Sequence, residues 1–384
     1  MAKKPVVLYG ASGYTGRLIA EYLRELGIPF IAAGRDAKRV KETMERVPGL
    51  DPATYDIVEV KHSVDALTEL FKGAKVVCNT VGPFATFGTE VVAACLTAGV
   101  HYTDTTGEQN WIKLCDEEFG HKFADKRLVL APCVAQMYTT GEIAAQICLE
   151  TPGVDTLDTL VLWKGFPTYA STQSIFTILM ADHLYLEHKQ YVKWPAATSY
   201  EVAVPGQHQT ALALAWGGTS HPITFKRDPR VASCKSLGGV FDRSLMQGVV
   251  QIAQMVEEKI KPLPPAQQVK ALSDAAASVQ AGMPPRESQR VNTSLDSVWA
   301  SGPLGKVHCA IYGACNYKQT GLLQAHAAYH LIHGQPKTVG FASGCQAFGH
   351  RELLGVLQSF GLVGQPAVTS SLQHHHHGGM HHGR

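Results

Sequence analysis

Several features that decide the class of a protein are missing from this chain of 384 residues. It has no run of eighteen apolar residues, which argues against a transmembrane helix. The formal net charge is only +2, so the charge balance gives no reason to expect nucleic acid or a membrane surface as a partner. The nine cysteines form no Cys-x-x-Cys motif and their number is odd, which favours reduced thiols in a cytoplasmic protein.

Metal-binding patterns are equally scarce. No histidine pair shows a spacing such as His-Glu-x-x-His, so the sequence predicts no catalytic or structural metal. The exception is the histidine-rich end of the chain, residues 366–384, which includes His374 to His377. Such a tract can bind metal ions, but it is also typical of a disordered tail or an added purification tag. We therefore assign no catalytic role to it.

The most informative stretch lies near the N-terminus. An apolar run from Val6 to Tyr9 is followed by three glycines and then at once by a helical pattern. A buried strand, a tight turn that lets the backbone approach a pyrophosphate, and a helix N-terminus facing the phosphates together form a dinucleotide site. The alternative is a strand–helix turn without a ligand. The candidate cofactor-binding residues of this stretch are Gly10, Ser12, Gly13, Tyr14, Thr15 and Gly16.

The second predicted strand, residues 29–33, indicates which dinucleotide binds. It leads into Gly34-Arg35-Asp36, where an acidic residue would suit the ribose of NAD and an arginine would suit the 2′-phosphate of NADP. Arg35 lies nineteen positions after Gly16, and Lys38 follows within one helical turn. We interpret Asp36 as the N-cap of the next helix. The sequence therefore favours NADP, with a solvated helix face as the alternative for Lys38.

Strands and helices alternate through the first third of the chain. This order predicts an α/β fold, a Rossmann doubly wound parallel sheet, with ligands at the carboxyl ends of the strands. That rule brings the end of the fourth predicted strand and Asp104 to the rim of the cofactor site. Asp104 could orient the cofactor or the substrate, as could Glu108, but Asp104 could equally hold the loop. The residues expected beside the nicotinamide, with a plain turn as the alternative, are Thr80, Val81, Gly82, Pro83 and Phe84.

The pattern changes after residue 133. It predicts an inserted α+β second domain across residues 134–334, with a helix at 174–188 and a short strand at 223–225 among its elements. We expect this domain to bind a small-molecule substrate and to support a homodimer. Residues 335–365 are expected to return to residues 1–133 and complete the NADP-binding domain, and residues 366–384 to form the tail.

Hydride transfer needs a proton donor or an oxyanion stabiliser near the acceptor. Tyr138 is our first choice because it follows the sixth predicted strand near the cleft, although a helix-packing tyrosine is the alternative. Tyr169 and Cys133 are further candidates. His101 and His183 complete the set, but the apolar neighbours of His183 favour a buried structural histidine.

Four motifs, in this order, resemble those of the saccharopine dehydrogenase-like oxidoreductases, including the trans-acting enoyl reductases. They are Gly10-Ala-Ser-Gly-Tyr-Thr-Gly16, Ala33-Gly34-Arg35-Asp36, Asn79-Thr80-Val81-Gly82-Pro83-Phe84 and the segment from His101 to Glu108. The resemblance implies a Rossmann domain completed by the C-terminal part, an inserted substrate domain, and a nicotinamide cofactor, usually NADP. It does not select a substrate. The segment from Pro132 to Gly141 departs from the family pattern, so we expect substrate and acid chemistry to differ there.

These observations lead to three functional hypotheses. The first is an NADP-dependent oxidoreductase that transfers a hydride between nicotinamide and a small organic substrate with an activated C=C, C=N or C=O bond. The second is a cofactor-binding scaffold or sensor without catalysis. The third is an acyl-phosphate or semialdehyde dehydrogenase with Cys133 as its nucleophile, which would require a partner histidine.

Overall fold

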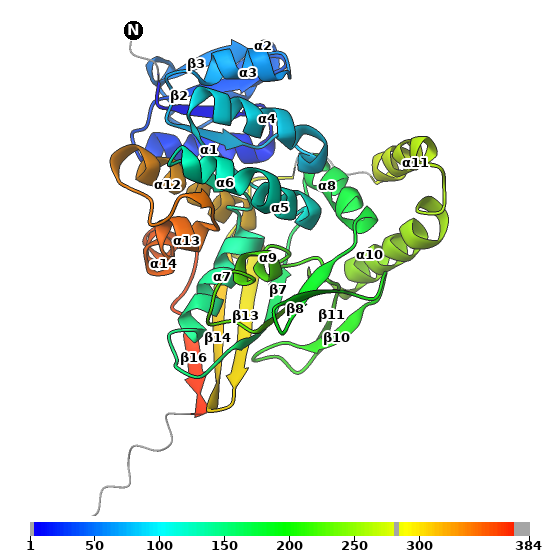
Figure 1. Cartoon of the computed structure of the whole chain (residues 1–384). Helices are drawn as coiled ribbons and strands as arrows, with labels where there is room; N and C mark the ends of the chain where they lie inside the picture. The colour runs from blue at the N-terminus through cyan, green and yellow to red at the C-terminus, as the bar shows by residue number, and fades with distance from the viewer. Residues whose placement is uncertain (1–3, 280–283, 372–384) are drawn as a thin grey trace, which may run out of the picture.

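The computed structural model describes residues 4–279 and 284–371; the histidines His374 to His377 lie outside this part. Its core consists of two seven-stranded sheets. Figure 1 shows the N-terminal sheet and its helices at the top, the second sheet at the bottom, and α7 (Gln136–Cys148) running between them. In the described part of the chain, no helix has the length and apolar character needed to cross a membrane.

The first sheet is parallel throughout and has the order β15-β6-β5-β4-β1-β2-β3. This arrangement confirms the predicted Rossmann fold. The strands are β1 (Val6–Tyr9), β2 (Phe30–Gly34), β3 (Tyr55–Glu59), β4 (Val76–Asn79), β5 (His101–Asp104), β6 (Val129–Ala131) and β15 (Gly340–Phe341).

Both faces of this sheet are covered by helices. Along β1, Val6 and Leu8 join one apolar core, whereas Val7 and Tyr9 join the other. A strand that alternates sides and is apolar on both is typical of a sheet buried between two helical layers. The first core receives α1 (Tyr14–Glu25), α2 (Ala37–Met44), α7, α12 (Asn316–His333), α13 (Gly344–Phe348) and α14 (His350–Ser359). The second receives α3 (Val64–Phe71), α4 (Phe84–Ala98), α5 (Gln109–Leu114), the π-helical turn η2 (Cys115–Phe119) and α6 (Gly120–Asp125).

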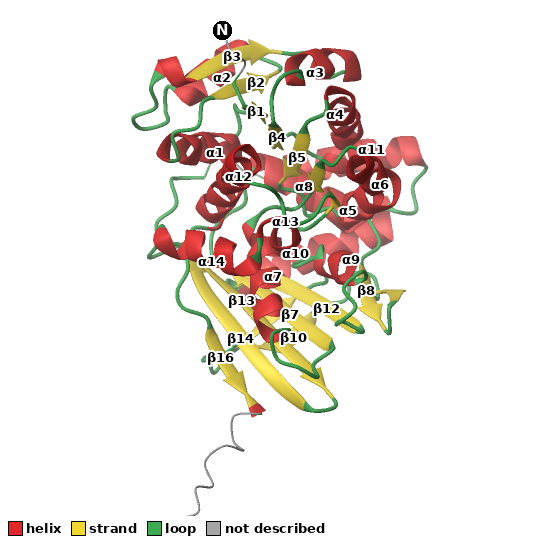
Figure 2. Ribbon diagram, turned by 60° about the vertical axis from the view of Figure 1, so that its left-hand side comes forward, coloured by secondary structure: helices red, strands yellow, loops and turns green. Residues whose placement is uncertain are grey.

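The second sheet is mixed and has the order β16-β14-β13-β7-β12-β8-β9. It lies below α7 in Figure 2. Its strands are β7 (Thr156–Trp163), β8 (Leu184–Glu187), β9 (Gln190–Lys193), β12 (Ser233–Val240), β13 (Thr293–Gly302), β14 (Gly305–Ala314) and β16 (Ala367–Ser370). The smaller elements around it are α8 (Tyr169–Met180), the β10–β11 hairpin (Tyr200–Ala203 and Thr210–Ala213), α9 (His221–Phe225), α10 (Arg243–Met255), η3 (Val256–Ile260) and α11 (Pro265–Ser278); the short turn η1 (Pro52–Thr54) belongs to the first domain.

Two expectations about the second domain were wrong. The helix predicted at 174–188 ends at Met180, and β8 follows because Leu186 is buried where β8 pairs with β12. The strand predicted at 223–225 is part of α9, which has Pro222 in its first turn, where the fixed φ of proline favours a helix. Three apolar residues in a row are too few to distinguish a buried strand from a buried helix.

The chain also crosses between the two sheets more often than predicted. Helix α12, which the sequence division placed in the second domain, packs against α1 of the first. Gly321 permits this close approach, because a Cβ there would lie 3.0 Å from the Cβ of Leu18. The predicted tail, in turn, begins with β16, which pairs with β14 and thereby satisfies the backbone groups of that strand.

Candidate active site

A cavity opens beyond the carboxyl ends of the first sheet, where α7, α8 and α12 of the chain meet the glycine-rich loop. This is the edge at which ligands bind in open α/β sheets. Its walls are formed by Gly13, Tyr14, Thr15, Gly16, Thr80, Gly82, Phe84, Thr105, Gly107, Ala135, Gln136, Met137, Tyr138, Trp163, Pro167, Thr168, Ala170, Ser171, Ser174, Ile175, Ile178, Asn316, Tyr317 and Thr320.

The glycines of the first loop are required by close contacts. Gly10 has a φ of +91°, and a Cβ there would lie 2.5 Å from the Oγ1 of Thr80. A Cβ on Gly16 would lie 2.7 Å from the carbonyl oxygen of Gly10. The first glycine thus makes the turn, and the third lets α1 pack against the strand.

The N-terminus of α1 is open to a ligand. Its N-cap is Gly13, and no side chain in the described part of the chain caps the helix. The first backbone N–H groups of α1 therefore have no intrahelical acceptor, and the helix dipole adds positive potential at the same place. Gly13, Thr15 and Gly16 all line the cavity. These features fit a pyrophosphate.

Arg35 directly follows β2 and is exposed. No hydrogen bond or ion pair engages its guanidinium within residues 4–279 and 284–371. Lys38, one turn into α2, is exposed as well. Asp36 is the N-cap of α2 and accepts a hydrogen bond from the backbone N–H of Arg39 over 3.0 Å, as the sequence indicated. The N–H donors of the Arg35 guanidinium are thus available to bind a phosphate.

A buried carboxylate fixes the loop after β4 through hydrogen bonds to its backbone. Glu108 accepts hydrogen bonds from the backbone N–H groups of Phe84 and Ala85, each over 2.8 Å, and so caps α4. Burial raises the pKa of Glu108 above its ordinary value. The hydroxyl of Ser174 donates to the same carboxylate over 3.3 Å, which ties α8 to this loop. Thr80, Gly82 and Phe84 line the cavity, and Val81 and Pro83 belong to the same loop.

Asp104 is fully buried and does not line the cavity. Its carboxylate accepts hydrogen bonds from the Tyr102 hydroxyl, the Trp111 indole and the backbone N–H groups of Thr106 and Cys133, over 2.8 to 3.0 Å. These contacts support the second reading of this residue, in which Asp104 holds the loop rather than the cofactor.

Tyr138 is the catalytic candidate that the structure brings into the cavity. It lies on α7, is 7% exposed, and faces Gly107 so closely that a Cβ there would lie 1.7 Å from its hydroxyl oxygen. Burial raises the pKa of the Tyr138 phenol above its ordinary value, and Cys133 and Glu108 nearby add to this effect. The hydroxyl therefore stays protonated at neutral pH and can donate a hydrogen bond.

The other catalytic candidates are placed elsewhere. Tyr169 begins α8, is 53% exposed and is absent from the cavity wall. Cys133 is buried, and burial raises the pKa of its thiol well above the ordinary value, which is the reverse of what a nucleophilic cysteine needs. His101 starts β5, at the opposite edge of the sheet, and accepts the backbone N–H of Val129. His183 lies between α8 and β8, also outside the cavity.

Sequence reasoning missed the contribution of α12. The first turn and a half of α12 contributes three residues to the cavity wall, Asn316, Tyr317 and Thr320. The Tyr317 hydroxyl donates to Ser171 over 2.8 Å and accepts the backbone N–H of Thr168 over 3.0 Å, so it fixes the start of α8. The sequence pattern predicts this helix only from Gly321 to His333 and so leaves out its first turn. The signal that could have found the earlier start was the end of the preceding strand at Ala314.

Comparisons with known proteins agree with this geometry. Residues 6–122 match the saccharopine dehydrogenase NADP-binding domain, and residues 139–372 match a family of unknown function, DUF5938. The structure of saccharopine dehydrogenase (L-Glu forming) from Saccharomyces cerevisiae aligns with a TM-score of 0.59 at 10% identity, over 95% of this chain and 100% of that one. At that identity, the likeness concerns the fold.

Curated relatives match a part of the chain. A lipid droplet localized protein of Caenorhabditis elegans is 32% identical over 143 residues, which are 35% of this chain and 33% of that protein. A trans-acting enoyl reductase of Mycobacterium ulcerans is 32% identical over 130 residues, 33% of this chain and 31% of that protein. Each match thus spans about a third of the relative. The chain belongs to the family of unknown function DUF5938, and its residues 6–122 form an NADP-binding domain similar to that of saccharopine dehydrogenase.

Proposed function

We propose that this protein is an NADP-dependent oxidoreductase that reduces an activated C=C, C=N or C=O bond in an uncharged, largely apolar small molecule. The observation that carries the proposal is the composition of the cavity wall. Among the described residues that line it, none is Lys, Arg, Asp or Glu. A buried charge on the substrate would be costly there, because no opposite charge could compensate for its lost hydration.

The cofactor would lie along the glycine-rich loop. The open N-terminus of α1 would bind the pyrophosphate, and Arg35, with Lys38, would bind the 2′-phosphate. Gly82 and Phe84, positioned by Glu108, would contact the nicotinamide end. When bound, NADPH supplies the hydride.

Tyr138 would assist the acceptor. Hydride addition to a polarised double bond builds negative charge on its far atom, and a positioned donor stabilises that charge. The Tyr138 hydroxyl, protonated and held against Gly107, is such a donor. It would first donate a hydrogen bond to the acceptor atom and then its proton.

The apolar part of the wall would hold the substrate and exclude water. Most of the large apolar side chains in this wall are those of Phe84, Met137, Trp163, Ile175 and Ile178. Excluding water strengthens the hydrogen bond from Tyr138, because the local dielectric constant is low. A protein with these properties would accept enones, ketones or neutral imines in preference to amino-acid substrates.

The test is NADPH consumption with a panel of neutral enones, ketones and imines. We expect turnover with at least one class, and about a 100- to 1000-fold lower kcat/KM in Tyr138→Phe, since one donor is removed. Tyr312→Phe is the matched control, because the Tyr312 hydroxyl donates to the carbonyl of Pro205 outside the cavity. NADPH binding without turnover of any member of the panel would instead support a scaffold or sensor.

A further inference from the structure

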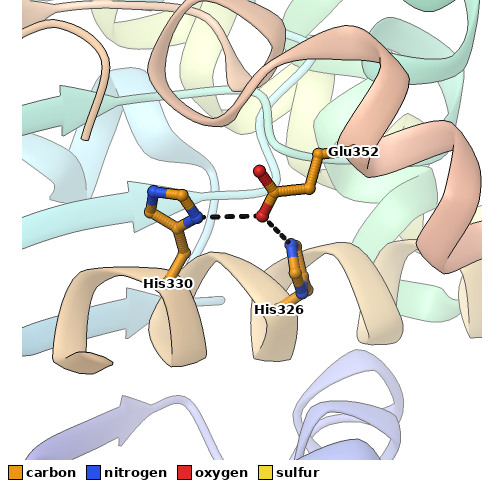
Figure 3. Close-up of side chains that lie close together, drawn as sticks. All are labelled: His326, His330 and Glu352. Carbon is orange, nitrogen blue, oxygen red and sulfur yellow. Dashed lines mark hydrogen bonds and ion pairs between the residues drawn. The ribbon is translucent and has the colours of Figure 1, made fainter. Parts of the chain in front are cut away.

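A second group of polar side chains lies where α12 meets α14, and none of them belongs to the cavity wall. His326 and His330 are four residues apart on this helix and therefore share a face, and Glu352 reaches them from the first turn of α14 (Figure 3). One oxygen of Glu352, Oε1, lies 3.1 Å from Nε2 of His326 and 3.0 Å from Nδ1 of His330. The three atoms all lie within 4.8 Å of one another.

The second ring nitrogen of His330 shows why this arrangement needs a cation. Nε2 of His330 lies 3.0 Å from the carbonyl oxygen of Gln335, which can only accept a hydrogen bond, so Nε2 carries a proton. In a neutral ring Nδ1 then presents a lone pair to the Glu352 carboxylate, which is also an acceptor. Two acceptors at this distance require a positive charge between them or a second proton on the ring.

We propose that His326, His330 and Glu352 bind a divalent transition-metal ion, with zinc as the best match. Zinc takes imidazole nitrogen at about 2.0–2.1 Å in tetrahedral geometry, which separates neighbouring ligand atoms by about 3.4 Å. The two nitrogen–oxygen distances are already close to this value. The two nitrogens lie within 4.8 Å of each other, so metal binding requires them to move closer to this separation.

The surroundings are those of a three-ligand site. The Gln335 carbonyl would orient the His330 ring, as the outer hydrogen bond of a metal-bound histidine commonly does. His326 is buried, whereas the Glu352 side chain is 40% exposed. A fourth position toward solvent is therefore open to water.

Such an ion would join two helices that are separate in the sequence. It would fasten α14 to α12, whose first turns supply Asn316, Tyr317 and Thr320 to the cavity. We therefore assign the ion a structural role that stabilises this part of the cavity wall. The sequence prediction of no metal did not anticipate the site, because Glu352 is 22 residues from His330.

The test must separate this cluster from the histidines at the end of the chain. The 384-residue chain with His374–His377, His381 and His382 replaced by asparagine serves as the background. Zn²⁺ binding is measured by calorimetry and, after dialysis, by elemental analysis. Co²⁺ is used as a spectroscopic probe, because its visible bands report tetrahedral coordination. We expect one bound ion per chain, tetrahedral Co²⁺ bands and a higher melting temperature with Zn²⁺.

His330→Ala is expected to abolish the bound equivalent, and Glu352→Gln to weaken Zn²⁺ binding at least tenfold. His333→Ala is the control, because it removes an exposed histidine from the end of the same helix outside the cluster. If His330→Ala does not fold, Glu352→Gln, which keeps the size of the side chain, decides the question. The proposal is overturned if the background protein binds no ion, or if Glu352→Gln binds Zn²⁺ as tightly as the background does; a protonated His330 paired with Glu352 would then account for the contacts.

Discussion

Replacing Arg35 should change cofactor choice without changing the fold. The guanidinium is exposed, has no hydrogen bond or ion pair within the described residues, and follows β2 where a 2′-phosphate would lie. A hydrogen bond to a charged group contributes about 1.5–3 kcal/mol, which corresponds to roughly a 10- to 150-fold change in affinity. Arg35→Ala should weaken NADPH binding by about that factor. NADH, which has no 2′-phosphate, should bind with nearly unchanged affinity.

The assay is a titration with each cofactor, followed by calorimetry or nicotinamide fluorescence, at low and high salt. The ratio of the two affinities should shrink with salt in the original protein, because an exposed ion pair is screened. Arg35→Asp should move the preference further toward NADH, since a carboxylate repels the phosphate and accepts the ribose hydroxyl. Lys41→Ala is the control, as Lys41 lies on α2, the helix that follows Arg35, and pairs with Glu45. Equal losses for NADPH and NADH in Arg35→Ala would refute the assignment.

Two further predictions concern the residues around the cavity. In Gly107→Ala the new Cβ must displace the Tyr138 ring, so we expect the free energy of unfolding, measured with urea, to fall by about 1–3 kcal/mol. Gly248→Ala is the control and should lose no stability, because there is open space at its Cβ. Equal stability of the two variants would show that the Tyr138 ring moves aside without cost. Burial raises the pKa of Glu287 from 4.5 to about 7 even though it accepts the backbone N–H of Lys318, so its stabilising contribution is complete below about pH 4.5 and is lost as pH rises through 7. Glu287→Gln should therefore gain stability relative to the original protein between pH 5 and pH 8, by up to about 3 kcal/mol in urea unfolding, and a difference that does not change with pH would contradict this.

Other expectations from the sequence stay predictions. These are a cytoplasmic location and a homodimer. Fractionation of the cells that make the protein would test the first. Light scattering of the purified chain would test the second.

The sequence by itself determined the parallel sheet and the cofactor class. In the first domain the pattern is local: Val6 to Tyr9, three glycines and a helix follow one another, and Arg35 comes directly after the next strand. Each requirement, such as the positive φ of Gly10 or the N-cap at Asp36, is met by residues a few positions apart. Interactions between residues a few positions apart can be predicted from the sequence alone.

Only the tertiary structure decided which side chains meet in the cavity and between α12 and α14. Tyr138 was a candidate among five, and its contact with Gly107 singled it out. The spacing of residues in the sequence could not show that the Asp104 carboxylate accepts four hydrogen bonds or that Cys133 is buried. The groups around these two residues come from other strands and loops.

The glycine-rich loop that first indicated a dinucleotide site therefore supports the proposed position of the cofactor, but it does not show what receives the hydride. The receiving cavity is closed by α7, α8 and the start of α12, which are up to 300 residues away from Gly16 in the chain. Burial and charge at such a place depend on the packing of elements that no local pattern links. That is why the uncharged wall, on which the proposed substrate class rests, emerged only from the fold.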